Sequence, residues 1–95
     1  MENFDIKMFD EFFDAVLKLK SKEDCRKFFE DVCTIKELQD VSQRLEVAKL
    51  LGQKKNYQEI SKLTGASTAT ISRVNKCLQY GKNGYRLVLD IKEKD

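Results

Sequence analysis

The segment YQEISKLTGASTATISRVNKCL, residues 57–78, decides the fold of this chain. Apolar residues at helical spacing line one side of each half, namely Ile60 and Leu63 before the break, and Ile71, Val74 and Leu78 after it. Gly65 lies where the chain must turn sharply with a positive φ, which glycine tolerates without steric cost. Ser61 is small, as a close crossing of two helices requires, and Ser67 can cap the second helix. The segment therefore predicts a helix-turn-helix.

The residues on the other side of the second predicted helix suit contact with DNA. They are short, polar or methyl-bearing at its start and basic further along: Ser67, Thr68, Ala69, Ser72, Arg73 and Lys76. Small side chains let the start of a helix approach base edges and thymine methyl groups, and the helix N-terminus attracts phosphate. Residues 62–86 contain no Asp or Glu that would repel the nucleic-acid backbone. We therefore predict that double-stranded DNA binds to this helix.

A different class of function is also compatible with this pattern. Helix pairs joined by a small turn occur in proteins that never contact DNA, so the segment could belong to a helical dimerisation or adaptor module. In such a module the helix-turn-helix would pack against protein. The two hypotheses differ in salt dependence, because phosphate contacts release counterions and weaken steeply as salt is added.

The first third of the chain predicts two amphipathic helices. Apolar residues recur at three- and four-residue spacing over residues 5–20, and Ser21 can cap a second helix. One face of that helix carries Cys25, Phe28, Phe29 and Val32. Four aromatic residues fall within the first 13 positions. They could form a core or an apolar face that a second subunit covers, and their spacing does not separate the two.

A long helix and a short one are predicted on either side of the helix-turn-helix. Thr34 and Glu37 form a capping box that opens the long helix, and Gly52 lies where it ends. Its expected inner positions are Leu38, Val41, Leu45 and Ala48. Over residues 84–92, Leu87, Val88 and Ile91 share one side of a predicted packing helix, although the run LVL also fits a strand.

Composition favours a single all-α domain. A chain of 95 residues has no room for a second core, and the absence of Pro with only four Gly disfavours an all-β fold. Oligomerisation is a common source of stability at this size. Residues 1–40 carry seven basic and eleven acidic residues, whereas residues 41–86 carry nine and two. This asymmetry is typical of a polyanion-binding element on a self-associating scaffold, although two solvated faces of different charge would also produce it.

What the sequence lacks disfavours several other functions. Without His, neither a Ser-His-Asp nor a Cys-His nucleophile can form, and we expect no enzyme activity and no metal site. Cys25, Cys33 and Cys77 show no Cys-x-x-Cys spacing, so we expect reduced and mostly buried thiols. No secretory signal and no apolar run of membrane-span length are present. We therefore expect a cytoplasmic protein without a membrane partner.

The stretch from Thr34 to Leu78 resembles the DNA-binding core of the tryptophan-repressor family. Its most specific part is Gly65-Ala66-x-x-Ala69-Thr70-Ile71-Ser72-Arg73, and the flanking helices correspond in order and approximate length. Within that superfamily the chain resembles the short tryptophan-repressor-related proteins of Gram-positive bacteria more than the repressor itself. The resemblance implies an all-α, intertwined homodimer with about six helices per chain. It also implies a transcriptional repressor that reads a pseudo-palindromic operator through the helix 68–80.

The resemblance also assigns the parts of the chain. Residues 1–95 would form one helix-turn-helix domain, with dimerisation helices over 1–33, a DNA-binding core over 34–80 and a packing helix over 84–92. The matching positions that face DNA in the family are Gln58, Ser61, Ser67, Thr68, Ala69 and Ser72. Arg44 and Arg73 match two arginines that hold the carboxylate of bound tryptophan, Arg44 only if the long helix is one residue shorter than the family's.

Two departures from the family concern its ligand. Val74 stands where the family has a Gly that leaves space for the indole ring, and Cys77 stands where it has a Ser of the ligand pocket. Forcing a ring beside a β-branched side chain costs about 1–3 kcal/mol. We therefore expect no cofactor and no response to L-tryptophan. Arg44 and Arg73 could instead hold a smaller anionic effector, or they could contact phosphate. Arg44 could also be a solvated helix residue or form an intersubunit ion pair.

Overall fold

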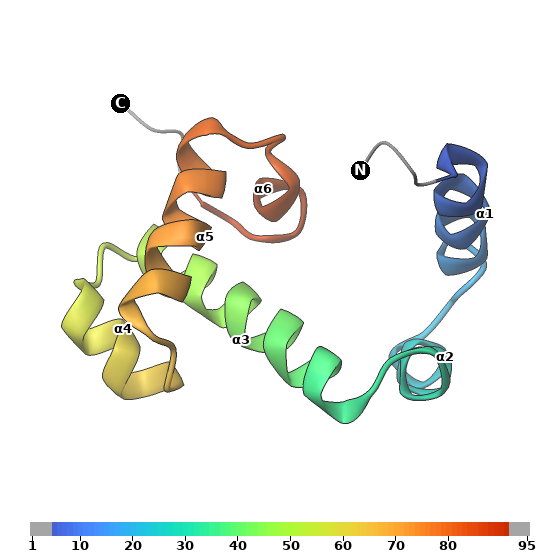
Figure 1. Ribbon diagram of the computed structural model, residues 1–95, viewed down its shortest axis with the longest axis horizontal. Helices are drawn as coiled ribbons and strands as arrows, with labels where there is room; N and C mark the ends of the chain where they lie inside the picture. Colours follow the sequence, from blue (N-terminus) through green and yellow to red (C-terminus); the bar gives the residue numbers. More distant parts are fainter. Residues whose placement is uncertain (1–4, 92–95) are drawn as a thin grey trace. The chain divides into compact units, whose positions relative to one another are not determined.

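The computed structural model describes residues 5–91 (Figure 1). Within this range the regular secondary structure is entirely α-helical, with no strand. The helices are α1 (Ile6–Val16), α2 (Lys22–Val32), α3 (Ile35–Gly52), α4 (Tyr57–Thr64), α5 (Thr68–Tyr80) and α6 (Gly84–Val88). The predicted all-α class with about six helices is therefore confirmed. The chain divides into two compact units, Met1–Leu38 and Gln39–Asp95, which are described separately.

Local hydrogen bonds start most of these helices where the sequence predicts them. Ser21 Oγ accepts a hydrogen bond from the backbone N–H of Asp24 at 3.0 Å. At the start of α3, the backbone N–H of Thr34 donates to the Glu37 carboxylate and the backbone N–H of Glu37 donates to the Thr34 hydroxyl, at 2.8 and 3.0 Å. The predicted capping box is therefore confirmed. A second such box, between Asn56 and Glu59 at the start of α4, was not predicted.

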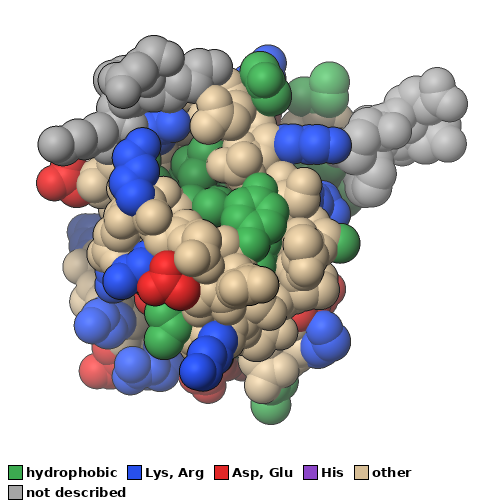
Figure 2. Space-filling model, turned by 90° about the vertical axis from the view of Figure 1, so that its left-hand side faces the viewer, with side chains coloured by type: hydrophobic (Ala, Val, Ile, Leu, Met, Phe, Trp, Pro, Cys, Tyr) green, Lys and Arg blue, Asp and Glu red, His purple; other side chains and the backbone are tan. Residues whose placement is uncertain are grey.

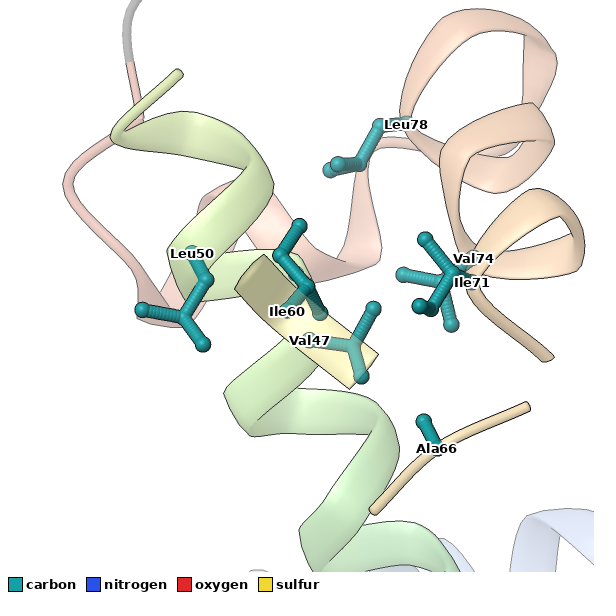
Figure 3. Close-up of a cluster of buried hydrophobic side chains, with 8 residues drawn as sticks. Val47, Leu50, Ile60, Ala66, Ile71, Val74 and Leu78 are labelled. Carbon is teal, nitrogen blue, oxygen red and sulfur yellow. The ribbon is translucent and has the colours of Figure 1, made fainter. Parts of the chain in front are cut away.

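The C-terminal unit has a core built by three helices and the turn between two of them (Figure 3). Its members are Val47, Ala48 and Leu50 of α3, Ile60 of α4, Ala66 of the turn, and Ile71, Val74 and Leu78 of α5. Burying one such aliphatic side chain contributes about 1.5–3 kcal/mol. Because α3, α4 and α5 share this core, apolar packing holds the helix-turn-helix against α3.

The side of α3 that enters the core differs from the predicted one. Of the expected inner positions only Ala48 is buried, whereas Val41 and Leu45 are 48% and 41% exposed. Val47 and Leu50 are buried instead. The reason is that α3 carries two apolar stripes, and α4 and α5 cover the one near its C-terminal end. Periodicity detects a stripe without showing which neighbour covers it.

Leu63 was also predicted to face inward, and this is wrong: its side chain is 65% exposed. Thr64 is half-buried in its place. Thr64 follows Ile60 by four residues, and its hydroxyl donates to the backbone carbonyl of Ile60 at 2.7 Å. The buried face of α4 therefore runs from Ile60 to Thr64 and leaves Leu63 beside it in solvent.

The C-terminal helix is shorter than predicted. It ends at Val88, because Leu89 adopts an extended conformation with φ −118° and ψ 142°. Leu87 and Val88 are 85% and 72% exposed, so the prediction that they share one packed side with Ile91 is wrong. The extended chain lets Ile91 pack against the core cluster, close to Gly52, where an added Cβ would lie 2.8 Å from Ile91 Cγ1.

The N-terminal unit has aromatic contacts and no buried residue within α1 or α2. The ring centroids of Phe12 and Phe28 lie 6.0 Å apart in a stacked arrangement, and those of Phe28 and Phe29 lie 5.3 Å apart edge to face. Helix α1 ends at Val16 rather than near residue 20. The backbone N–H groups of Lys18 and Leu19 bond to carbonyls three residues earlier, as in a 3₁₀ turn, instead of four residues earlier as in an α-helix. Large apolar side chains stay exposed here: Ile6, Met8, Phe13, Leu17, Val32 and Ile35.

The three cysteines are free thiols, but the expectation that they are mostly buried is wrong. Cys25 and Cys77 are exposed and Cys33 is half-buried. Cys25 belongs to α2, which buries no residue, and Cys77 lies beside the buried stripe of α5 rather than within it. Their surroundings in the single chain therefore do not resemble a core.

Candidate nucleic-acid interface

The turn between α4 and α5 fixes the angle at which the second helix leaves the first. Gly65 has φ +77°, and its backbone N–H donates to the Ser61 carbonyl at 2.8 Å. The predicted positive φ is confirmed. A residue with a Cβ is disfavoured in this left-handed conformation by about 1–2 kcal/mol, so glycine suits the position.

Side chains satisfy other backbone groups of the same turn. Ser61 Oγ donates to the Ala66 carbonyl at 2.8 Å, and the backbone N–H of Ala66 donates to Thr64 Oγ1 at 3.1 Å. Gln43 Nε2, from α3, donates to the Thr64 carbonyl at 3.2 Å. The last carbonyls of a helix have no partner within it, so such bonds replace those lost where α4 ends. Sequence analysis missed both residues: Gln43 lies 21 positions from its partner, whereas the bonds of Thr64 to Ile60 and Ala66 are local and its residue type next to Gly65 was the available signal.

The start of α5 is capped as predicted and presents small residues to solvent. Ser67 Oγ accepts a hydrogen bond from the backbone N–H of Thr70 at 3.1 Å. Thr68 and Ala69 are exposed and Ser72 is half-buried, while Ile71 and Val74 on the opposite side are buried. The first turn of α5 contains no acidic residue. The start of α5 itself therefore carries no charge that opposes the approach of a polyanion.

Basic side chains extend the surface beyond the start of α5. Arg73 and Lys76 of α5 and Lys62 of α4 are all exposed. Lys54 and Lys55, in the connection between α3 and α4, are also exposed. Figure 2 shows Lys and Arg side chains spread around the side on which α4 lies in Figure 1. Long basic side chains in this arrangement can contact phosphates without strict geometric requirements.

The candidate residues on α4 have two different environments. Gln58 is exposed near the start of α4 and can reach a ligand outside the molecule. Ser61 is half-buried, and its hydroxyl is engaged with the Ala66 carbonyl. Ser61 therefore uses its hydroxyl within the turn. The other candidate residues at this surface are exposed, except for the half-buried Ser72: Gln58, Ser67, Thr68, Ala69, Arg73 and Lys76. Contact of any of them with DNA stays a prediction.

The four residues assigned to a possible effector site lie on two helices. Arg44 is half-buried on α3, and Arg73 is exposed on α5. Val74 is only 1% exposed and belongs to the core cluster (Figure 3). Cys77 lines an open, mostly apolar hollow of about 510 Å³ together with Gly81, Lys82, Gly84, Tyr85 and Val88. Val74 and Cys77 therefore face different surroundings.

Among residues 5–91, no three Cys, Asp or Glu side chains gather as metal ligands would. None of the helices described here has the length and apolar character needed to span a membrane.

These features define a class of protein: a helix-turn-helix protein whose second helix exposes small and basic residues. Residues 7–93 match the family model described as Trp repressor protein. The chain therefore belongs to the Trp repressor family, a family of DNA-binding helix-turn-helix regulators.

Several known proteins are similar to this chain over most of its length. YerC of Bacillus subtilis is 50% identical over 90 residues, which are 94% of this chain and 86% of YerC. The crystal structure of a TrpR-like protein from Eubacterium eligens superposes with a TM-score of 0.86 at 46% identity, covering 92% of this chain and 94% of that one. A crystal structure from Staphylococcus aureus, described as that of a candidate Trp repressor, superposes with a TM-score of 0.86 at 47% identity. The match covers 93% of this chain and 91% of that one.

The environment of Ser61 generates a prediction about stability. Replacing Ser61→Ala should lower the free energy of unfolding by about 0.5–1.5 kcal/mol, because the Ala66 carbonyl loses its donor. Urea denaturation measures this change. Ser42→Ala, at an exposed position of α3, is the control and should leave stability unchanged or slightly raised, since Ala favours helix. Equal effects of the two substitutions would contradict the role of Ser61 in the turn.

Proposed function

We propose that this protein is a sequence-specific, double-stranded DNA-binding transcriptional repressor that acts as a homodimer. The observation that carries the proposal is the division of α5 into two sides. Ile71 and Val74 anchor it in the core, while Thr68, Ala69 and Arg73 are exposed from its capped start onward. In this proposal the helix 68–80 enters the major groove, where small polar side chains contact base edges and the lysines contact phosphates.

The proposed dimer is supported by the N-terminal unit. Ile6, Leu17 and Val32 are 73%, 81% and 51% exposed, and α1 and α2 bury no residue of their own. Apolar surface of this extent needs a partner, because water contact with it opposes folding. We propose that a second copy of the chain covers it and that the two copies are intertwined. Residues 1–33 would then serve dimerisation and 34–80 DNA binding within one domain, while Ile91, after α6, packs against the core.

The proposed repressor binds DNA without L-tryptophan. Support comes from Val74, whose side chain fills core volume beside Ile60 and Ile71 at 1% exposure. A helix held by its own packing gains little from a ligand, since a ligand shifts an equilibrium only by its differential affinity for the two states. An anionic effector smaller than tryptophan, held by Arg44 and Arg73, is compatible with this proposal. No catalytic step is part of it.

Substitutions on α5 should separate reading of bases from contact with phosphates. With an operator fragment selected from genomic DNA, Thr68→Val should lower the preference for that fragment over a scrambled one by about tenfold. Lys76→Gln should weaken binding to both fragments and reduce the salt slope by about one. Fluorescence anisotropy at several salt concentrations measures both quantities.

An exposed lysine outside this surface provides the matched control. Lys18→Gln, at an exposed position after α1, should change neither quantity. An unchanged fragment preference after Thr68→Val would show that α5 is not the reading helix. Binding of the unmodified protein to DNA without any salt dependence would favour the adaptor function instead.

The proposed assembly predicts the mass of the protein in solution. Light scattering at micromolar concentration should give about twice the 11.1 kDa mass of the chain, because the apolar N-terminal surface is covered only in the dimer. Leu17→Asp, at an 81% exposed apolar position, should shift the mass toward the monomer, whereas Lys18→Gln beside it should not. A compact monomer for the unmodified protein would overturn the intertwined arrangement.

If DNA binding is independent of tryptophan, the affinity for the operator should not change as L-tryptophan is added. Operator affinity should change less than twofold when millimolar L-tryptophan is added, with the same concentration of L-leucine as the control. Anisotropy with the selected fragment measures it. A tenfold rise with L-tryptophan alone, about 1.4 kcal/mol of coupling, would show that Val74 leaves the ligand site usable.

A further inference from the structure

The last carbonyl of α4 has a partner on another helix. Gln43 Nε2 donates to the Thr64 carbonyl at 3.2 Å, across 21 positions of sequence, and both side chains are half-buried. The amide of Gln43 also lies close to the turn residue itself, because an added Cβ at Gly65 would be 4.0 Å from Nε2. The Gln43 side chain therefore lies against the point where the chain direction changes.

The other bonds of the turn hold its shape but not its position. Ser61 bonds the Ala66 carbonyl, and Thr64 bonds the Ile60 carbonyl and the Ala66 N–H, all within six residues of sequence. These contacts move with the turn as one body. They fix the conformation around Gly65 without fixing the turn relative to α3.

Apolar packing is the other contact between α3 and the helix-turn-helix. Val47, four residues after Gln43 on α3, packs in the cluster that contains Ile60 and Ile71. The hydrophobic contribution of such contacts is non-directional. A hydrogen bond is directional in distance and angle. The amide of Gln43 thus adds a directional constraint where apolar packing supplies none.

We propose that Gln43 is a positioning residue for DNA reading: it ties the turn to α3 and so sets the placement of the start of α5. This inference rests on the proposed DNA-binding function. Contacts with base edges tolerate little displacement, whereas long basic side chains follow a phosphate over a wider range. Gln43 therefore governs discrimination between DNA sequences more than general affinity for DNA.

The first experiment tests the tie in the free protein. Gln43→Met keeps the length and helix preference of the side chain and removes the donor, and Gln43→Glu removes the donor while keeping the shape. Amide hydrogen exchange at Gly65 and Ala66 should become about threefold to tenfold faster in both variants. Gln39→Met, at an exposed position one turn earlier on α3, is the control and should leave exchange unchanged. Exchange within twofold of the unmodified protein in both Gln43 variants would overturn the proposal.

The second experiment tests the consequence for DNA reading. Gln43→Met, which adds no charge, should lose about threefold to tenfold of the preference for a selected fragment over a scrambled one, with unchanged affinity for scrambled DNA and an unchanged salt slope. A parallel loss for both fragments, together with reduced helix content, would overturn the positioning role in favour of general destabilisation. If the unmodified protein prefers no fragment, the proposed function fails and the DNA-reading role of Gln43 fails with it. The exchange result then still decides separately whether Gln43 holds the turn.

Discussion

The left-handed turn at Gly65 is the constraint on which the rest of the C-terminal unit depends. With φ +77° it reverses the chain within three residues, so that Ile60 of α4 and Ile71 of α5 meet in one core. The same reversal leaves the start of α5 in solvent with its cap at Ser67 intact. A side chain at position 65 would be strained there whatever space surrounds it. The candidate DNA-binding surface follows from this one backbone conformation.

The two units of the chain meet the hydrophobic requirement in different ways. The C-terminal unit buries eight residues from α3, α4, α5 and the turn, which gives it a core of its own. The N-terminal unit has stacked phenylalanines, such as Phe12 on Phe28, but α1 and α2 bury nothing completely. This contrast fits a division of labour in which one half presents a surface to DNA and the other presents apolar side chains to a second chain.

Polar side chains in the turn have a structural part that their residue types conceal. Ser61 is a small polar residue next to a candidate DNA-binding surface, yet its hydroxyl is bonded to the Ala66 carbonyl. Thr64 and Gln43 likewise use their polar atoms on the backbone around Gly65. Each bond satisfies a backbone group that the end of α4 or the start of the turn leaves without a helical partner. Specific reading of DNA by α5 would depend on these bonds as much as on the residues that reach the bases.

Structural elements with local causes could be predicted from the residues alone. The caps at Ser21 and Ser67 and the capping box of Thr34 and Glu37 join residues three positions apart, and the bonds of the glycine turn span at most five positions, so their chemistry is visible in the sequence. Composition and apolar periodicity predicted the all-α class and the order of the helices, and the family resemblance implied the same fold.

Which apolar side of a helix is buried, and which distant atoms meet, depends on how the helices pack in three dimensions. Val47 rather than Val41 enters the core, and Thr64 rather than Leu63 faces inward. The bond from Gln43 joins positions 21 residues apart. The physical reason is that periodicity reveals an apolar stripe but not its partner, and a hydrogen bond between distant residues depends on how the helices pack.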